Sequence, residues 1–207
     1  MTDFSKRYLF RITHIDNVKH ITHFGITHAN SKNHNINYKP IGDKSLISRR
    51  KEFITPNGKS LGGYIPFYFG IRMPMLYVIQ KGYNGVSQIH PEKIVYCVSS
   101  VEQILKHHIP FYFTDGHAVD SLSEFYGHNE LENIDKIIDL NAIKTKYWKN
   151  ENDLDIKRRK EAEFLIENDL PSAAVLGFIV YNELSKNKLL AFGIESKKIV
   201  IKSDYYF

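Results

Sequence analysis

Glu163 is the residue whose surroundings most favour a chemical role. It lies in the stretch DIKRRKEAEFLIENDL (residues 155–170), which predicts an amphipathic helix with an apolar face formed by Ile156, Ala162, Leu165 and Ile166. Burying an unpaired carboxylate is costly, so a Glu among apolar positions either packs against a core or points into a cleft. In a cleft it stabilises positive charge that develops on a substrate. At a solvated helix edge it has no such role.

Other polar residues that could take part in chemistry are scattered along the chain. They are His14, Asp16 and Asn17 after the first predicted strand, Arg50, and His117 within FYFTDGHA. Each also has an ordinary structural explanation. A histidine can hydrogen-bond a turn, Asp115-Gly116 is a common turn pair, and an arginine can be a surface cation. Singly, none of them identifies a reaction.

The sequence gives little support to several common kinds of site. His20 and His23 lie three apart, with His14 and His28 nearby, but zinc sites usually add a second matched pair or cysteine ligands. We therefore expect no metal. No GxGxxG or P-loop spacing is present. Cys97 is the only cysteine and lies in an apolar run, which predicts a buried, unreactive thiol.

Positive charge gathers in two short runs, residues 49–51 and 157–160, and the formal net charge is +5. This charge permits a polyanionic partner without requiring one. A phosphate-binding track would use Arg49, Lys51, Lys157 and Arg158, whereas solvated helix faces explain the same residues without a ligand. The 13 Tyr and 13 Phe residues either build an aromatic core or offer platforms on which bases stack.

Short predicted strands and helices alternate without a regular βαβ period. Strands are predicted at residues 8–14, 64–69, 93–99, 110–113, 173–181 and 198–202, with 173–181 as a central strand and 198–202 as an edge strand. Helices are predicted from Asp16 as the cap to Gly25, around residues 49–50, and at 74–80, 101–107, 129–140, 155–170 and 182–192. Residues 26–46 form a long polar loop, a type of segment that often carries binding residues. The pattern favours an α+β fold with mixed β-sheets and flanking helices.

Length and composition place further bounds on the protein. At 207 residues, with no linker or low-complexity tract, we expect one domain spanning residues 1–207. No stretch approaches the roughly 18 apolar residues of a membrane span, and the N-terminus lacks an apolar signal region. We therefore expect a cytoplasmic protein with no membrane partner.

Six blocks of the sequence together resemble the DarT family, toxins of the DarT–DarG toxin–antitoxin systems, in the same order. The blocks are RITHIDN (11–17), IGDKSLISRRKEF (41–53), LGGYIPFYFGIRMPMLYVI (61–79), IVYCVSS (94–100), FYFTDGHA (111–118) and RRKEAEFLI (158–166). The resemblance covers nearly the whole chain. It implies a compact ADP-ribosyltransferase fold.

The resemblance also implies an activity and partners. A mono-ADP-ribosyltransferase toxin of this family transfers ADP-ribose from NAD to a base in single-stranded DNA, thymidine or guanosine, and releases nicotinamide. NAD is then the co-substrate and no metal is needed. The implied protein partner is a cognate antitoxin with ADP-ribosyl-hydrolase activity.

Roles for individual residues follow from matching positions in the family's blocks. The resemblance implies that Glu163, Arg50 and His117 are catalytic. It implies that the residues contacting NAD are His14, Asp16, Asn17, Gly25, Arg50, Tyr68, Met75 and Tyr77. The DNA-binding cations would be Arg49, Lys51, Lys157 and Arg158.

Elementary chemistry is compatible with these roles. Cleavage of the nicotinamide–ribose bond creates oxocarbenium-like positive charge, which a carboxylate such as Glu163 stabilises. Arg50 could pair with the NAD pyrophosphate through two N–H groups. A ring nitrogen that carries a proton must lose it during attack, and Arg50 and His117 are the candidate acceptors.

The sequence is also compatible with two other functions. A related ADP-ribosyltransferase acting on RNA or protein would share the NAD residues and differ in the acceptor groove. A non-enzymatic module that binds single-stranded nucleic acid would use the basic and aromatic residues but would have no need of Glu163.

Overall fold

The centre of the fold is a mixed β-sheet. A computed structural model describes residues 3–207. The strands are β1 (Tyr8–His14), β2 (Ile65–Tyr68), β3 (Ile94–Ser100), β4 (Phe111–Thr114), β5 (Phe125–Tyr126), β6 (Glu163–Ile166), β7 (Gly177–Val180) and β8 (Ile199–Ile201). Within the described residues they form one eight-stranded sheet in the order β5-β4-β6-β2-β1-β3-β7-β8. Neighbouring strands are antiparallel except for β7 and β8, which are parallel.

The sheet has a weak seam between β1 and β2. Strand β1 pairs with β3 along its whole length, from Tyr8 opposite Ser100 to His14 opposite Ile94. Its register with β2 consists of the single pair Phe10 and Tyr68. The sheet therefore divides into two halves, β5-β4-β6-β2 and β1-β3-β7-β8, which are joined through this one pair of residues.

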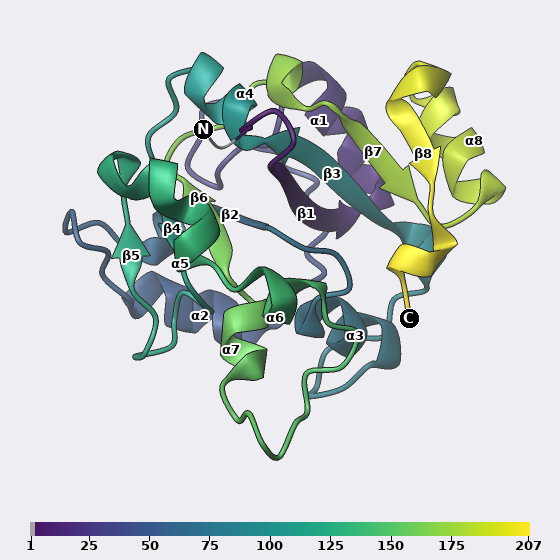
Figure 1. Cartoon of the computed structure of the whole chain (residues 1–207). Helices are drawn as coiled ribbons and strands as arrows, with labels where there is room; N and C mark the ends of the chain where they lie inside the picture. Colours follow the sequence, from purple (N-terminus) through teal and green to yellow (C-terminus); the bar gives the residue numbers. More distant parts are fainter. Residues whose placement is uncertain (1–2) are drawn as a thin grey trace.

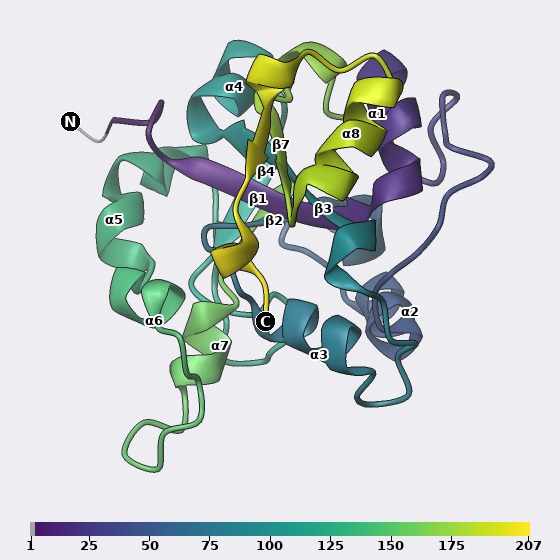
Figure 2. The ribbon, with the colours of Figure 1, turned by 90° about the vertical axis from the view of Figure 1, so that its right-hand side faces the viewer.

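Helices cover both faces of the sheet. They are α1 (Val18–Phe24), α2 (Lys44–Glu52), α3 (Pro74–Lys81), α4 (Val101–Lys106), α5 (Ile134–Ile137), α6 (Leu140–Lys144), α7 (Ile156–Lys160) and α8 (Glu183–Ala191). In Figures 1 and 2, α1, α4 and α8 lie above the sheet, whereas α2, α3 and α7 lie below it. The helices and the long loops thus enclose a sheet that is buried on both faces.

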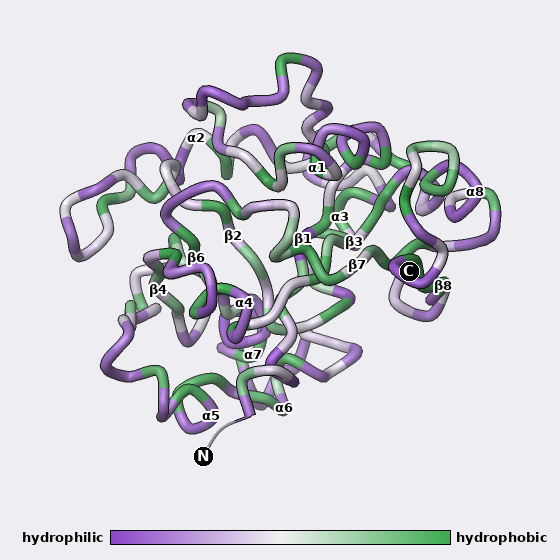
Figure 3. Tube along the Cα trace, turned by 90° about the horizontal axis from the view of Figure 1, so that it is seen from above, coloured by the Kyte–Doolittle hydropathy of each residue, from purple (hydrophilic) through white to green (hydrophobic). Residues whose placement is uncertain are grey.

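The two faces have separate apolar cores because side chains alternate along each strand. On β3, Val95 and Cys97 belong to the large cluster that also contains residues of α1, α4, α5 and α8. Tyr96, between them, points the other way and packs with Leu76 of α3. Figure 3 shows the hydrophobic stretches along the inner strands and the hydrophilic stretches along the outer loops.

Most predicted elements are present, and the α+β prediction is confirmed. The main correction concerns residues 155–170, which were expected to form one helix. Helix α7 ends at Lys160, and β6 begins at Glu163. All four residues of β6 are buried. A strand buried on both faces is continuously apolar, and its sequence cannot be told from a buried helix by period alone.

Smaller corrections concern three other elements. Asp16 lies in a short 3-10 turn (Ile15–Asn17), and Asn17 is the residue that caps α1. Residues 129–140 form a 3-10 helix (His128–Asn133) followed by α5, rather than one α-helix. The strand expected at 173–181 is shortened to β7, which lies next to the edge strand β8 rather than at the centre of the sheet.

Candidate active site

Glu163 is the first residue of β6 and is completely buried. Its carboxylate has partners on both oxygens: Arg50 Nη1 donates to Oε2 at 2.8 Å, and the backbone N–H of Ala118 donates to Oε1 at 3.0 Å. The Glu163 backbone N–H donates to the Thr114 hydroxyl at 3.1 Å. These contacts fix the position of a buried charge that would otherwise be costly.

Helix α2 supplies Arg50. The helix begins after Asp43, whose carboxylate accepts a hydrogen bond from Ser45 N at 2.8 Å and so caps the first turn. Adjacent residues on a helix point about 100° apart, and Arg50 turns inward while Arg49 and Lys51 remain exposed. The Arg50 side chain is 14% exposed. Its Nη2 is buried and has no hydrogen-bond partner within residues 3–207, which leaves a donor free for a ligand.

The loop after β4 places a histidine beside the same carboxylate. His117 Nε2 lies 3.9 Å from Glu163 Oε1. Burial lowers the pKa of His117, and the neighbouring Glu163 only partly opposes this effect. The imidazole is therefore mainly uncharged at neutral pH and can accept or donate one proton.

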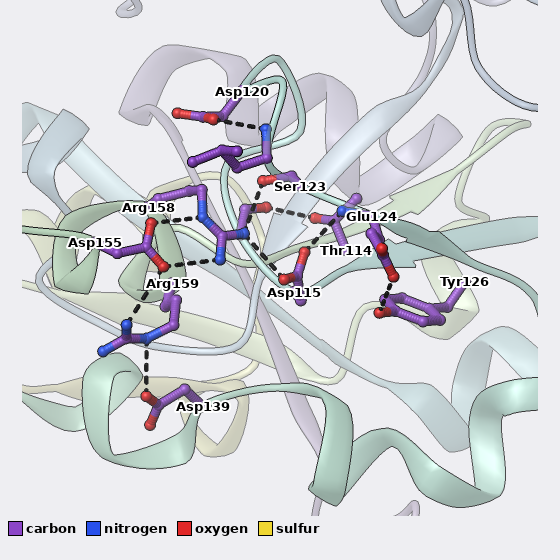
Figure 4. A network of polar contacts seen from close by, with 12 residues as sticks. Thr114, Asp115, Asp120, Ser123, Glu124, Tyr126, Asp139, Asp155, Arg158 and Arg159 are labelled. Atoms are coloured by element: carbon purple, nitrogen blue, oxygen red, sulfur yellow. Dashed lines mark hydrogen bonds and ion pairs between the residues drawn. The ribbon is translucent and has the colours of Figure 1, made fainter.

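Arg158 anchors this loop to α7. Its guanidinium donates to Asp155 Oδ1 at 2.7 Å and to Asp115 Oδ2 at 3.0 Å, and also reaches the Ser123 hydroxyl at 3.2 Å. Figure 4 shows the side chain enclosed by these partners. Only 12% of the Arg158 side chain is exposed. The charge of Arg158 thus serves to position the loop, and the expected role of this residue in DNA binding stays a prediction.

A cavity of about 380 Å³ lies at the seam between β1 and β2. Its walls come from both strands, from α2, and from the loop that follows α1; lining residues include Arg11, Thr13, Asn17, Gly25, His28, Tyr38, Arg50, Lys51, Ile65 and Pro66. Arg50 belongs to this wall and also contacts Glu163. Arg50 thus links the cavity wall to the buried carboxylate.

Two predicted NAD residues, Asn17 and Gly25, shape the cavity. Asn17 Nδ2 donates to the Thr13 hydroxyl at 3.0 Å and to the Lys39 carbonyl at 2.9 Å, while Asn17 Oδ1 accepts from Lys39 N at 2.8 Å. It therefore holds the long loop over β1. Gly25 has φ +79°, and a Cβ there would lie 1.9 Å from the Leu170 carbonyl oxygen. Only glycine allows this close approach.

His14 and Asp16 lie outside the lining of this cavity. His14 Nδ1 accepts from Asp16 N at 3.2 Å. Hydrogen bonds from Lys188 and Lys39 lower the pKa of Asp16 to about 2. These contacts join the end of β1 to the long loop and to α8, so the structure gives both residues a supporting position outside the cavity lining.

The aromatic and apolar candidates divide into two groups. Tyr68 is paired with Glu163 across β2 and β6, so the two side chains share a face of the sheet. Burial and the nearby Glu163 raise the pKa of Tyr68. Met75 belongs to the core under α3. Tyr77 packs against Tyr83, Trp148 and Phe207 in an aromatic cluster that the structure does not bring to the cavity.

The sequence prediction missed three residues. Arg11 lines the cavity and donates to the Pro66 carbonyl at 2.9 Å. Thr114 holds the backbone of Glu163. Glu161, two residues before Glu163, is partly buried beside it. Alternation along the predicted first strand would have identified Arg11 on the same face as Thr13. Glu161 lies in the turn after α7, which the helix predicted over residues 155–170 concealed.

Two kinds of feature are absent from residues 3–207. These residues contain no group of three His, Cys, Asp or Glu side chains arranged to hold a metal ion. No helix in the same range is long and apolar enough to cross a membrane.

Comparison with known proteins gives consistent matches. A sequence profile described as "ssDNA thymidine ADP-ribosyltransferase, DarT" matches residues 10–207. A DNA ADP-ribosyl transferase of Thermus sp. (strain 2.9) is 32% identical, covering 96% of this chain and 95% of the relative. A DNA ADP-ribosyl transferase–DNA ADP-ribosyl glycohydrolase fusion protein of Thermosipho africanus is 32% identical over 77% of this chain and 39% of its own length.

Solved structures show the same fold. Thermus sp. 2.9 DarT in complex with ADP-ribosylated ssDNA superimposes with a TM-score of 0.82, at 30% identity, over 97% of this chain and 96% of that one. Thermus sp. 2.9 DarT in complex with NAD+ gives a TM-score of 0.78 at 28% identity, covering 100% and 99%. The profile match, the similar relative and the shared fold together show that the chain belongs to the DarT family of DNA ADP-ribosyltransferases.

Proposed function

We propose that this protein transfers ADP-ribose from NAD to a thymine base in single-stranded DNA and releases nicotinamide. The observation that carries the proposal is a buried Glu163 held by Arg50, which itself lines a cavity at the seam of the sheet. Membership of the DarT family supports both NAD as co-substrate and single-stranded DNA as acceptor. Thymine is proposed over guanine because the matching profile is described by thymidine.

NAD would occupy the cavity lined by Arg11, Asn17, Gly25 and Arg50. The free Nη2 of Arg50 is the feature that favours this assignment, because a buried donor without a partner is satisfied by a ligand oxygen. One side of the guanidinium would bind NAD while the other holds Glu163. His14 and Asp16 would affect NAD binding indirectly, by holding the long loop in position. Met75 and Tyr77 would affect it through their packing on α3.

Glu163 would perform the central electrostatic step. As the nicotinamide–ribose bond breaks, positive charge develops on the ribose ring, and a fixed carboxylate stabilises it more than water does because no reorganisation is needed. The hydrogen bonds from Arg50 and Ala118 provide this fixed position. Tyr68, on the same face of the sheet, and His117 would form the remaining walls around the reacting atoms.

An antitoxin that removes the modification is the proposed protein partner. The Thermosipho africanus relative joins a DNA ADP-ribosyl transferase to a DNA ADP-ribosyl glycohydrolase in one chain. A fused pair of opposed activities supports a separate hydrolase acting on the product of this protein. It also supports a toxin role, because unreversed modification of bases blocks base pairing.

The test is mass spectrometry of oligonucleotides incubated with the enzyme and NAD. We expect an added ADP-ribose on single strands that contain thymine and none on matched strands without it. RNA or protein modification in place of DNA modification would contradict the proposal. Glu163→Gln should lower the rate by roughly 100-fold or more, whereas Glu102→Gln on the exposed surface of α4 should leave it unchanged.

A further inference from the structure

A second cavity, of about 560 Å³, lies between α1 and the long loop that follows this helix. Figure 2 shows the loop running beside α1 and on to α2. The loop contributes residues 32–37 and Lys39 to the wall. The opposite wall has residues spaced three or four apart, which therefore occupy one face of α1 and of the turn before it. They are Asp16, Lys19, His20, His23 and Phe24.

This second cavity adjoins the cavity assigned to NAD. His20, His34 and Asn35 line both of them, so the two cavities lie on either side of a shared wall. Lys19 and Phe24 line the second cavity and are not part of the lining of the first. Their side chains can therefore be changed without removing a wall of the NAD cavity.

The loop that forms one wall is held at both ends by hydrogen bonds. Near its start, the Asp169 carboxylate accepts from the backbone N–H of His28 at 2.8 Å and from the Ser31 hydroxyl at 2.5 Å. At its far end, Asn17 Oδ1 accepts from the backbone N–H of Lys39 at 2.8 Å. The wall is thus in place before a ligand arrives, which lowers the cost of ordering it on binding.

The charge of the second cavity is positive. Lys19, Lys32 and Lys39 line it, and Asp16 is the one carboxylate among the described residues of the lining. Asp16 already accepts hydrogen bonds from Lys39 Nζ at 2.6 Å and from Lys188 Nζ at 2.5 Å. Lys19 and Lys32 have no carboxylate partner among residues 3–207. Two cations are therefore available to an anionic ligand.

An exposed aromatic ring lies beside these cations. Phe24 is 51% exposed, and its ring centroid lies 4.9 Å from that of His20, with the two planes inclined by 30°. Burial lowers the pKa of His20, so this support for the ring is mainly uncharged at neutral pH. Single-stranded nucleic acids bind to such a combination, because a base stacks on the ring while a phosphate pairs with a cation.

Size and donor geometry agree with a nucleotide as the ligand. The volume falls within the range of small-ligand sites, about 300–1,000 Å³. Although three histidines line the cavity, residues 3–207 contain no group of three His, Cys, Asp or Glu side chains that could hold a metal ion. The lining therefore favours an anion with a planar ring over a metal.

We propose that the second cavity binds a nucleotide of the DNA strand that flanks the modified base, with its base stacked on Phe24 and its phosphate paired with Lys19 and Lys32. This inference rests on single-stranded DNA as the proposed acceptor. The strand would lie along the long loop while its target base enters the reaction site. The contact adds affinity without selecting a base, because stacking and phosphate pairing tolerate any sequence.

The experiment compares two labelled strands by fluorescence anisotropy: the shortest thymine strand that the enzyme modifies, and the same strand extended at both ends. The wild-type protein should bind the extended strand more tightly. Phe24→Ala should lose roughly 5-fold or more of this gain, the usual contribution of one stacked base. The double variant Lys19→Ala/Lys32→Ala should lower the slope of log affinity against log salt by about 1.4, since each phosphate contact on a single strand contributes about 0.7.

Controls separate a contact with DNA from a loss of structure or of net charge. Both variants should bind the shortest strand as the wild type does, which a misfolded protein would not. Phe24→Tyr should keep the gain, because it keeps the ring, whereas Phe24→Leu should lose it. Lys106→Ala/Lys198→Ala removes two exposed lysines from α4 and from the segment before β8, and should change the slope less.

Three outcomes would contradict the proposals. An extension gain that persists in both Phe24→Ala and the double lysine variant would overturn the inference. Weaker NAD binding in these variants, with DNA binding unchanged, would make the second cavity part of the NAD site and would also overturn it. A wild-type protein that modifies no single strand would instead refute the proposed function itself.

Discussion

The two basic runs of the chain, residues 49–51 and 157–160, are similar in composition but have different surroundings. On α2, Arg49, Arg50 and Lys51 are adjacent, and only Arg50 is drawn inward to pair with Glu163. Arg49 and Lys51 remain exposed, although Arg49 Nη2 reaches the Val119 carbonyl at 3.3 Å. This run therefore presents one cation to the reaction site and two to the surface.

On α7, most of the positive charge is already used inside the protein. Arg158 pairs with Asp155 and Asp115, and Arg159 pairs with Asp153 and Asp139. Figure 4 shows Arg158 between Asp155 and Asp115, and Arg159 beside Asp139 at the start of α6. Lys160 is buried, with a pKa that burial lowers to about 8. Lys157 alone of the four is exposed.

The difference teaches that a run of cations in a sequence does not measure the charge available to a partner. What decides availability is the number of carboxylates that the fold brings to the run. Helix α2 receives the single buried carboxylate of Glu163, whereas α7 receives several partly exposed ones. We therefore expect α2 and Lys157 to contact ligands, and Arg158 and Arg159 to hold the frame.

The largest expected effect is at Arg50. Arg50→Ala should lower the single-turnover rate by roughly 100-fold or more, because it removes both the partner of Glu163 and the free Nη2. Arg50→Lys should rescue poorly, since an ammonium lacks the planar fork that serves two partners. Arg49→Ala should stay within a few-fold of wild type at saturating NAD and DNA.

The measurement needs a check on folding, because removing Arg50 leaves a buried charge unpaired, which typically costs about 3–5 kcal/mol. Circular dichroism melts of all three variants supply it. A folded Arg50→Lys with full activity, or equal defects at positions 49 and 50, would remove the distinction between the inward cation and its neighbours.

The inward turn of Arg50 was predictable only through the family resemblance. Three adjacent cations on a helix give no indication from composition alone of which one faces the core. The pairing of Arg158 with Asp155 could have been anticipated from their i, i+3 spacing. Its second partner, Asp115, is distant in sequence, and only the folded chain brings it to α7.

The fold itself was predicted well where periodicity was clear, as for β1, β3 and α3. It was predicted wrongly where the sequence is ambiguous. Ala162–Ile166 is apolar except for Glu163, and β6 is buried on both faces, so alternation is invisible there. The error had a consequence for the site: treating the segment as a helix hid the position of Glu163 on a strand, opposite Tyr68.

A smaller effect is expected at Arg158. Arg158→Met should release the loop after β4 and lower the free energy of unfolding by about 1.5–3 kcal/mol, the range for hydrogen bonds to charged groups. Transfer should fall by roughly tenfold, because Ala118 and His117 would hold Glu163 less well. Chemical denaturation and single-turnover rates measure the two effects.

Lys157→Met is the matched control for Arg158→Met, since it removes a positive charge from the same helix without breaking an ion pair. It should leave the stability unchanged within error. If Arg158→Met kept full stability and instead weakened DNA binding as Lys157→Met does, then Arg158 would be a DNA contact as the sequence first indicated.

The smallest expected effect is on the salt dependence of DNA binding, and it separates free cations from paired ones directly. Each phosphate contact on a single strand contributes roughly 0.7 to the slope of log affinity against log salt, because neutralising a phosphate releases counterions. Arg49→Ala, Lys51→Ala and Lys157→Ala should each lower the slope by about this amount. Arg159→Ala should leave the slope unchanged, since the Arg159 guanidinium is held by Asp153 and Asp139.

Fluorescence anisotropy with a labelled thymine strand, repeated over a range of salt concentrations, gives the slopes. Lys197→Ala, which removes a lysine paired with Glu195, controls for net charge alone. A lower slope in Arg159→Ala but not in Lys157→Ala would reverse the assignment of the cations on α7.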